Sequence, residues 1–245
     1  MNAWATAALD LLYPALCPVC GHGLDAGRRD PLCGECWAAI DRIERPFCAR
    51  CGLPLPRFEP AAEAVPPRCP TCVAAAPPFE YIRAAGAYTG VLRAALHALK
   101  FGGKRALARP LAALMLEQGG AFLGPDVDAL VPVPLALGRE RERGFNQATL
   151  LARHLAAVSG LPVESRWLSR RRSTRPQTEL TASERRTNVA RAFSASPRAA
   201  GAHIVLVDDI VTTGATAAEC ARTLRAAGAR TVGVLAVARV LTVTL

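Results

Sequence analysis

Residues 204–216 read IVLVDDIVTTGAT, and they constrain the fold more than any other segment of the chain. An uninterrupted apolar run of this length is typical of a central strand that is buried on both faces of a parallel sheet. Residues 215–227 then predict a helix that ends at Gly228. The loop between strand and helix lies at the carboxyl end of the strand, where ligands bind in open α/β sheets. The segment therefore predicts an α/β fold with a ligand site in this loop.

The residues of this loop suit a ribose phosphate. A helix amino terminus offers unpaired backbone N–H groups and a positive dipole end to a phosphate, and threonine hydroxyls add further donors. The carboxylates of Asp208 and Asp209 would accept hydrogen bonds from ribose hydroxyls, directly or through a hydrated Mg²⁺. The alternative is a buried strand and a capped helix beside a fortuitous pair of acids.

The same segment resembles the signature for 5-phosphoribosyl-1-pyrophosphate (PRPP) in type I phosphoribosyltransferases. In that signature the paired acids contact the ribose, and the Thr-Thr-Gly-Ala-Thr turn holds the 5-phosphate. The resemblance implies that PRPP or a related ribose phosphate binds together with Mg²⁺. The residues that would bind it are Asp208, Asp209, Thr212, Thr213, Gly214, Ala215 and Thr216.

Eight of the nine cysteines form four Cys-x₂-Cys pairs, which are typical of zinc sites. Each pair places two thiolates on one side of a tight turn, and two such turns close a tetrahedron around a soft divalent ion. The repeated Cys-Gly step in the first and third pairs favours sequential pairing into two sites. A cross-braced arrangement, in which the first and third pairs share a metal, stays open. The predicted ligands are Cys17, Cys20, Cys33, Cys36, Cys48, Cys51, Cys69 and Cys72.

The two predicted zinc ions are structural, because each site already has four cysteine ligands and no open position. They supply much of the folding free energy of a segment with few apolar residues. A thioredoxin-like redox role is the alternative for a Cys-x₂-Cys pair, although one pair would be enough for it. Cys220 has no partner nearby and is predicted to be a packed thiol on the helix of residues 215–227.

Basic residues near two predicted helices are candidates for binding phosphate. Residues 91–99 have helical spacing, and Lys100 and Lys104 flank the Gly-Gly stop that follows. Each lysine either contacts a phosphate or is a solvated residue that the helix dipole favours. Residues 129–135 predict a strand, and the basic segment of residues 138–147 follows it before another helix.

In a phosphoribosyltransferase fold that second segment would occupy the pyrophosphate site. If it forms an extended loop, Arg139, Arg141 and Arg143 point the same way, unless the two intervening glutamates pair with them.

Residues 166–191 hold eight arginines against two glutamates. In type I phosphoribosyltransferases the equivalent region is a mobile hood that closes over PRPP. Here the segment would serve PRPP, follow a single-stranded nucleic acid backbone, or form an exposed loop without a ligand. Its candidate phosphate-binding residues are Arg170, Arg171, Arg172 and Arg175.

Length and charge set wider limits. A chain of 245 residues has room for one α/β domain and a small module. Its formal net charge of +10 falls to +6 when two Zn(Cys)₄ sites contribute −2 each, and this balance fits an anionic partner.

The first 16 residues carry no secretory pattern and predict a short amphipathic helix. No apolar run approaches the roughly 18 residues of a membrane span. We expect a cytoplasmic, reduced protein without stable membrane insertion.

Several further motifs occur in order after the cysteine pairs. They include Leu99-Lys100-Phe101, Val131-Pro132-Val133-Pro134, Arg143-Gly144-Phe145-Asn146-Gln147 and Arg175-Pro176-Gln177-Thr178. Together with the signature they resemble the ComF family of competence proteins. The resemblance implies a double zinc ribbon in residues 1–78, and in residues 79–245 a type I phosphoribosyltransferase-like parallel sheet flanked by helices. It also implies a role in natural transformation, in which the protein handles incoming single-stranded DNA beside a helicase-like DNA-import ATPase.

Two functions from different classes remain open. In the first, the protein binds single-stranded DNA and keeps the phosphate pocket as a binding site for a PRPP-type ligand. In the second, it is an active Mg²⁺-dependent phosphoribosyltransferase that acts on an unknown nitrogen acceptor, and the arginines of residues 139–143 stabilise the leaving pyrophosphate. The sequence shows no recognisable acceptor pocket, which favours the first function, and it identifies no catalytic residue.

Overall fold

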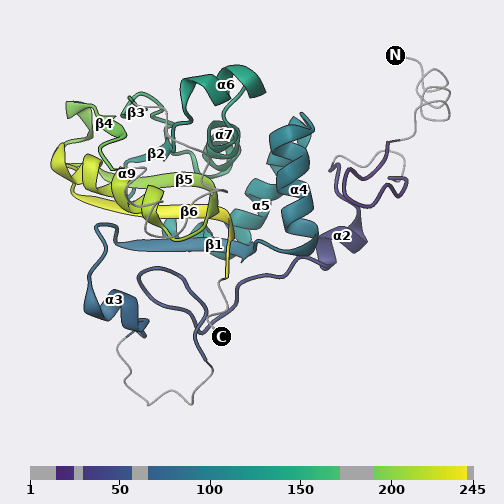
Figure 1. The fold of residues 1–245 in the computed structure, drawn as a ribbon, viewed down its shortest axis with the longest axis horizontal. Coiled ribbons are helices and arrows are strands. Elements are labelled where there is room, and N and C mark those ends of the chain that lie inside the picture. Colours follow the sequence, from purple (N-terminus) through teal and green to yellow (C-terminus); the bar gives the residue numbers. More distant parts are fainter. Residues whose placement is uncertain (1–14, 25–29, 57–65, 172–189, 242–245) are drawn as a thin grey trace.

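The structure of the protein is a computed structural model that describes residues 15–24, 30–56, 66–171 and 190–241 (Figure 1). Most of the predicted amino-terminal helix lies outside these residues. Arg172 and Arg175, two of the candidate phosphate-binding residues, lie outside them as well.

A four-stranded parallel sheet forms the centre of the fold, in the order β1-β6-β5-β2. The strands are β1 (Tyr81–Ala87), β2 (Ala129–Pro132), β5 (His203–Val211) and β6 (Thr231–Arg239). The strand predicted from residues 204–211 is confirmed as β5, and residues 204–207 are fully buried between β6 and β2. The apolar run therefore gives the strand that it predicts, with both faces covered.

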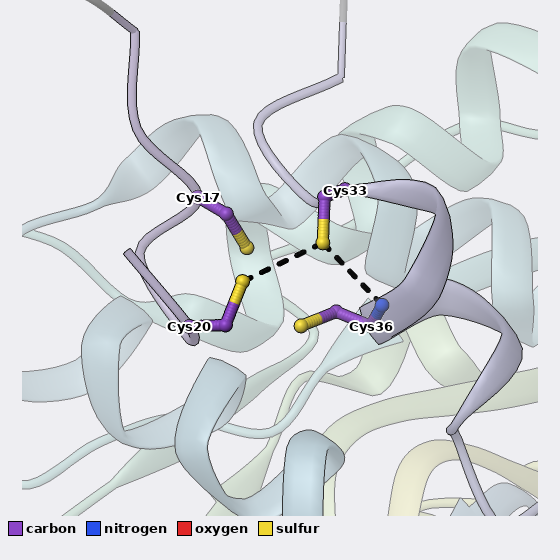
Figure 2. Close-up of side chains that lie close together, drawn as sticks. All are labelled: Cys17, Cys20, Cys33 and Cys36. Carbon is purple, nitrogen blue, oxygen red and sulfur yellow. Dashed lines mark hydrogen bonds between the residues drawn. The ribbon is translucent and has the colours of Figure 1, made fainter. Parts of the chain in front are cut away.

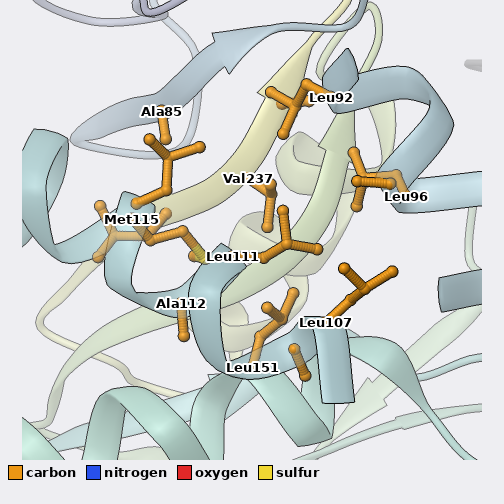
Figure 3. Close-up of a cluster of buried hydrophobic side chains, with 14 of the residues drawn as sticks. Ala85, Leu92, Leu96, Leu107, Leu111, Ala112, Met115, Leu151 and Val237 are labelled. Atoms are coloured by element: carbon orange, nitrogen blue, oxygen red, sulfur yellow. The ribbon is translucent and has the colours of Figure 1, made fainter. Parts of the chain in front are cut away.

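Helices cover both faces of the sheet (Figure 1). On one face lie α4 (Gly90–Phe101), α5 (Ala108–Gly119) and α7 (Gln147–Ser159), whose leucines pack together in the larger core (Figure 3). On the other face lies α9 (Ala215–Ala226), which confirms the helix predicted after the signature. Gly228 follows it with a φ of 94°, a left-handed conformation that suits glycine.

Smaller elements complete the described chain. They are α2 (Gly34–Ala38), α3 (Pro70–Ala74), α6 (Leu137–Arg143), the antiparallel pair β3 (Leu168–Arg170) and β4 (Phe193–Ala195), and the short 3₁₀ turns Arg105–Leu107, Gly120–Phe122 and Pro197–Ala199.

The segment expected as an extended basic loop forms α6 instead, so that expectation is wrong. Arginine and glutamate are good helix formers, and Gly144 ends the helix with a φ of 71°. Arg139 and Arg143, four residues apart, therefore share one helix face and are half-buried, whereas Arg141 is exposed on another face. The three arginines do not point the same way.

The amino-terminal segment packs against the outer strand of the sheet. The N–H of Ala87 donates to the backbone oxygen of Asp41 at 2.8 Å, and the N–H of Ile82 donates to the backbone oxygen of Arg50 at 2.7 Å. These bonds cover the free edge of β1, which would otherwise offer unpaired backbone groups to another chain. Figure 1 shows α2 beside α4 and α3 beyond β1, so the two halves of the segment lie at different sides of the sheet.

Candidate functional site

The first cysteine cluster has the geometry of a zinc site. The four sulfur atoms lie within 4.8 Å of one another and point to a common centre (Figure 2). The Sγ atoms of Cys20 and Cys33 are 3.6 Å apart, close to the roughly 3.8 Å expected for two thiolates of a tetrahedral Zn²⁺ site. The cluster consists of Cys17, Cys20, Cys33 and Cys36.

The second cluster repeats this arrangement with Cys48, Cys51, Cys69 and Cys72. Burial alone would raise the pKa of the Cys48 thiol, but hydrogen bonds from backbone N–H groups, including those of Cys51 and Cys69, hold it at about 6. A thiol that ionises readily is ready to bind a metal. The sequential pairing is therefore confirmed and the cross-braced arrangement is excluded, and each tetrad fits one structural zinc ion.

The paired acids lie at the carboxyl end of β5. The N–H of Asp209 donates to Oδ1 of Asp208 at 2.9 Å, which fixes the two carboxylates beside each other. Oδ2 of Asp209 forms an ion pair with Nζ of Lys100 at 2.7 Å, and both side chains are largely buried. Lys100 is therefore not a solvated helix-end lysine, because Asp209 holds its amino group.

Asp208 has an unusual environment for a carboxylate. Burial and the neighbouring charge of Asp209 raise its pKa to about 7, although Lys100 and Arg170 act in the opposite direction. The raised pKa means that a cation or a set of hydroxyl donors would stabilise the ionised carboxylate. Shifts of this kind are found at binding and catalytic sites more often than elsewhere.

The turn after β5 leads directly into α9. Gly214 adopts a φ of 80° immediately before the helix, a conformation that residues with a Cβ rarely adopt. Oγ1 of Thr213 accepts a hydrogen bond from the N–H of Ala215 at 3.4 Å, and Thr216 is half-buried at the second position of α9. The turn thus ends at the amino terminus of α9, and the N–H groups of such a terminus can bind an anion.

Basic side chains from α4, α6 and β3 converge on the acids. Arg143 is within electrostatic reach of Asp209, and burial lowers its pKa. Arg139 lies near both Arg143 and Arg170, and Arg170 lies near Asp208. This convergence brings together residues that are more than 100 positions apart in the chain.

Two of the predicted arginines do not join this group. Arg141 and Arg171 are both exposed, and the backbone N–H of Arg171 donates to the oxygen of Ala192 at 2.8 Å. Arg170 also differs from the exposed segment that the sequence suggested. It belongs to β3, is half-buried and lies over the ring of Phe193 at 5.4 Å.

Three residues near the site are not among the candidate site residues predicted from the sequence, although Asn146 and Phe101 lie in its motifs. Asn146 is buried, accepts from the N–H of Ala148 and donates to the oxygen of Val133, so it joins α7 to the end of β2. An Asn at the start of a helix is a capping signal that would have found it. Arg239 is buried at the end of β6, and no local pattern indicates its contact with Cys51. Phe101 ends α4, directly after Lys100.

A cavity of about 400 Å³ lies between the turn and the second cysteine cluster. Its wall includes Thr212 and Thr213 on one side and Cys51 and Cys69 on the other, together with Arg239. Nη1 of Arg239 donates to the oxygen of Cys51 at 2.6 Å. The second cluster is thus in direct contact with the end of the sheet that carries the turn.

Comparison with known protein families agrees with both halves of this architecture. A double zinc ribbon domain matches residues 8–65, and a phosphoribosyl transferase domain matches residues 141–242. The first match ends before the fourth cysteine pair, so the cluster geometry is what assigns Cys69 and Cys72. The fold and the clusters define a protein that joins a double zinc ribbon to a phosphoribosyltransferase fold.

Full-length relatives give a more particular assignment. The DNA utilization protein YhgH of Salmonella typhimurium is 36% identical over 235 residues, which cover 94% of this chain and 100% of that protein. Competence protein F of Haemophilus influenzae is 29% identical, over 86% of this chain and 91% of that protein. Competence protein ComFC of Bacillus subtilis is 31% identical, over 80% and 78%. The chain belongs to the ComF family.

Among the described residues, no helix has the length and apolar character needed to cross a membrane.

Proposed function

We propose that this protein binds a PRPP-type ribose phosphate with Mg²⁺ and binds single-stranded DNA, and that it acts in the uptake or use of DNA. The observation that carries the proposal is the convergence of Lys100, Arg143 and Arg170 on the paired acids at the end of β5. We place this function in the cytoplasm, beside a helicase-like DNA-import ATPase, with a domain boundary near Phe79.

The chemistry of the paired acids supports the ribose phosphate. Their carboxylate oxygens are acceptors, as ribose hydroxyls and hydrated Mg²⁺ require. Entry of the ligand would compete with Lys100 for Asp209, since these two groups are 2.7 Å apart in the structure. The released ammonium group would then be free to face the diphosphate, where Arg139 and Arg143 would neutralise further charge.

The DNA part of the proposal is supported by the relatives and by the charge. Relatives that match nearly the whole chain are named for DNA utilization and competence. The formal charge of +10 comes almost entirely from arginine, which binds phosphate through paired donors. Arg170 and Arg171 would contact the DNA backbone, together with Arg172 and Arg175, which lie outside the described residues.

Calorimetry with PRPP in the presence and absence of Mg²⁺ tests the site. Replacement of Asp208 and Asp209 by Asn preserves shape and removes both charges. We expect Mg²⁺-dependent affinity to fall by more than about tenfold, because hydrogen bonds to charged groups each contribute roughly 1.5–3 kcal/mol. Unchanged affinity in the double variant, with an intact thermal transition, would show that the ribose phosphate does not bind here.

An active phosphoribosyltransferase is the second candidate, and the intact signature with arginines beside the acids favours it. The test is release of pyrophosphate from PRPP and Mg²⁺ in the presence of a panel of nitrogen acceptors. Turnover above the rate without protein would establish transfer, whereas binding without release would leave the protein as a ligand-binding accessory.

A further inference from the structure

Phe101, the last residue of α4, lies near the paired acids but has no role in the candidate ribose phosphate site. It is 62% exposed, and among the described residues it is the one aromatic side chain in the group of exposed large apolar residues. Single exposed apolar residues are common, so exposure alone carries no argument. The surroundings of the ring are what distinguish it, because Lys100 precedes it directly and pairs with Asp209.

A guanidinium group lies over this ring. The Cζ atom of Arg143 is 4.8 Å from the ring centroid of Phe101. The ring centroid of His97, one turn earlier in α4, is also 4.8 Å from that of Phe101. Arg143 is also within electrostatic reach of Asp209. A single arginine thus connects the exposed ring with the candidate ribose phosphate site.

The arrangement occurs a second time in the neighbouring loop. The Cζ atom of Arg105 lies 4.7 Å from the ring centroid of Phe145, and its Nη2 donates to the oxygen of Gly144 at 3.3 Å. This bond holds the loop after α4 against the loop between α6 and α7. Phe101, Arg105, Arg143 and Phe145 therefore form one surface, which we call the aromatic–arginine patch.

The positive charge of this patch is only partly balanced, because Arg143 is half-buried near Asp209 whereas Arg105 is exposed. Across the described parts of the chain, no carboxylate lies within salt-bridge distance of Arg105, and none does so for Arg143. Lys104 is exposed beside them. Exposed cations such as Lys104 and Arg105 attract an anion, and aromatic faces beside them add a flat apolar surface.

We propose that the aromatic–arginine patch is a binding site for single-stranded DNA, in which a nucleobase stacks on Phe101 while Arg105 and Arg143 contact the flanking phosphates. Single-stranded nucleic acids are bound by this combination of aromatic stacking and a basic groove, because every base has a stacking face and every nucleotide a phosphate. The site lies beside the acids, so a bound strand passes next to the ribose phosphate. This inference rests on the proposed DNA function and adds the residues that perform it.

A single-stranded ligand contributes to the binding free energy in two ways, through its bases and through its phosphates. Stacking depends on the presence of bases but not on salt, whereas phosphate contacts release counterions and weaken as salt rises. Duplex DNA offers phosphates but no unstacked base, and an abasic oligomer offers a flexible phosphate chain without bases. The ring of Phe101 should therefore affect only ligands with unpaired bases.

The experiment measures binding of the full zinc-loaded chain to fluorescent oligothymidylate and to an abasic oligomer of equal length, over a series of salt concentrations. Phe101→Leu keeps an apolar side chain and removes the aromatic face, and Phe101→Trp keeps the face. Val158→Ala, at a site on α7 that is 71% exposed, is the matched control for loss of exposed apolar surface.

We expect Phe101→Leu to weaken oligothymidylate binding about tenfold with an unchanged salt slope and an unchanged affinity for the abasic oligomer. Phe101→Trp should retain the affinity, and its added tryptophan fluorescence should be quenched by the oligomer with bases. Val158→Ala should match the wild type.

Two results overturn the proposal in different ways. In the first, the wild type binds oligothymidylate, and Phe101→Leu either binds it equally well or loses affinity for both oligomers to the same extent. The ring of Phe101 is then not a stacking site, while the DNA function stands. If the wild type binds neither oligomer, the DNA part of the proposed function fails and the patch fails with it.

Discussion

Asp208 shows how one residue takes its properties from several distant parts of the chain. Its backbone position follows from β5, but its charge state depends on Asp209, on Lys100 from α4 and on Arg170 from β3. Lys100 forms its ion pair with Asp209, and together with Arg170 it offsets only part of the effect of burial and of the Asp209 charge on Asp208. A buried acid in this position holds its proton more strongly than it would in water.

The first prediction concerns the stability of the ligand-free protein. The folded-state pKa of Asp208 is about 7, above the usual value of 3.8, so the folded protein keeps a proton that the unfolded chain releases. The contribution of Asp208 to stability is therefore greatest below about pH 4, is lost as the pH rises towards 7 and is constant above that value. Asp208→Asn should remove this loss and raise the melting temperature at pH 8 by roughly 5 °C.

Melting curves between pH 4 and pH 8.5 check this prediction. The gain of Asp208→Asn should shrink towards zero as the pH falls to 4, because both forms are then neutral. Asp126→Asn, at an exposed position, should show no gain at any pH. A variant that melts below the wild type at pH 8 would mean that the ionised carboxylate stabilises the fold.

At the scale of elements, α6 decides which arginines can serve the site. The sequence around it has strand, basic segment and helix in order, which suggested a loop with three parallel arginines. A helix instead places Arg139 and Arg143 on the half-buried face and Arg141 on the exposed face. The difference matters because the arginines have the same chemistry and differ only in direction.

The second prediction compares two of these arginines. Arg143→Gln should weaken binding of PRPP with Mg²⁺ by about tenfold, since it removes a cation beside the acids. Arg141→Gln, only two residues away and with the same change of charge, should change the affinity less than about twofold. Calorimetric titration of both variants with PRPP and Mg²⁺ measures the two affinities. Equal losses would indicate that α6 contributes general charge rather than a positioned contact.

The second cysteine cluster reaches the same site through β6. Arg239 at the end of this strand donates to the oxygen of Cys51, and the N–H of Val240 donates to the oxygen of Val211 at 2.9 Å. Val211 directly precedes the turn of residues 212–216. The zinc site and the turn are therefore parts of one connected structure.

The third prediction tests this connection. Cys48→Ser should reduce the zinc content from two ions per chain to one, because it removes one of four ligands. It should also weaken PRPP binding severalfold, although Cys48 is not part of the ribose phosphate site. Zinc analysis and calorimetry on one preparation provide both values. Loss of one zinc with unchanged PRPP affinity would show that cluster and turn are independent.

For the whole molecule, what could be predicted from the sequence depends on how local each signal is. The cysteine pairs and the segment of residues 204–216 are continuous patterns, and the structure confirms their clusters, strand and helix. The pair of Lys100 with Asp209 joins residues from α4 and β5, and no spacing rule contains it. The same holds for Arg239 with Cys51, because tertiary packing alone brings these residues together.

The packing of the amino-terminal segment is a further property of the whole molecule. Cys17, Leu32 and Cys36 belong to the same buried core as Leu92 and Leu96 of α4, so the first zinc cluster is continuous with the main core. Residues 41–50 supply the hydrogen bonds along the edge of β1. Removal of this segment would expose apolar surface and unpaired backbone groups at the same time.

The last prediction follows from that continuity. The fragment of residues 79–245 should lack a cooperative thermal transition or should aggregate, although it contains the whole four-stranded sheet. In the full chain, Leu32→Ala should cost about 2–5 kcal/mol of stability, because Leu32 is 2% exposed against the main core. Val73→Ala, at a position that is 69% exposed on α3, is the control and should cost little. Calorimetric melting of the fragment and the two variants gives the comparison. A fragment that melts sharply at the temperature of the full chain would show that the sheet domain folds alone and that the zinc ribbon is only attached to it.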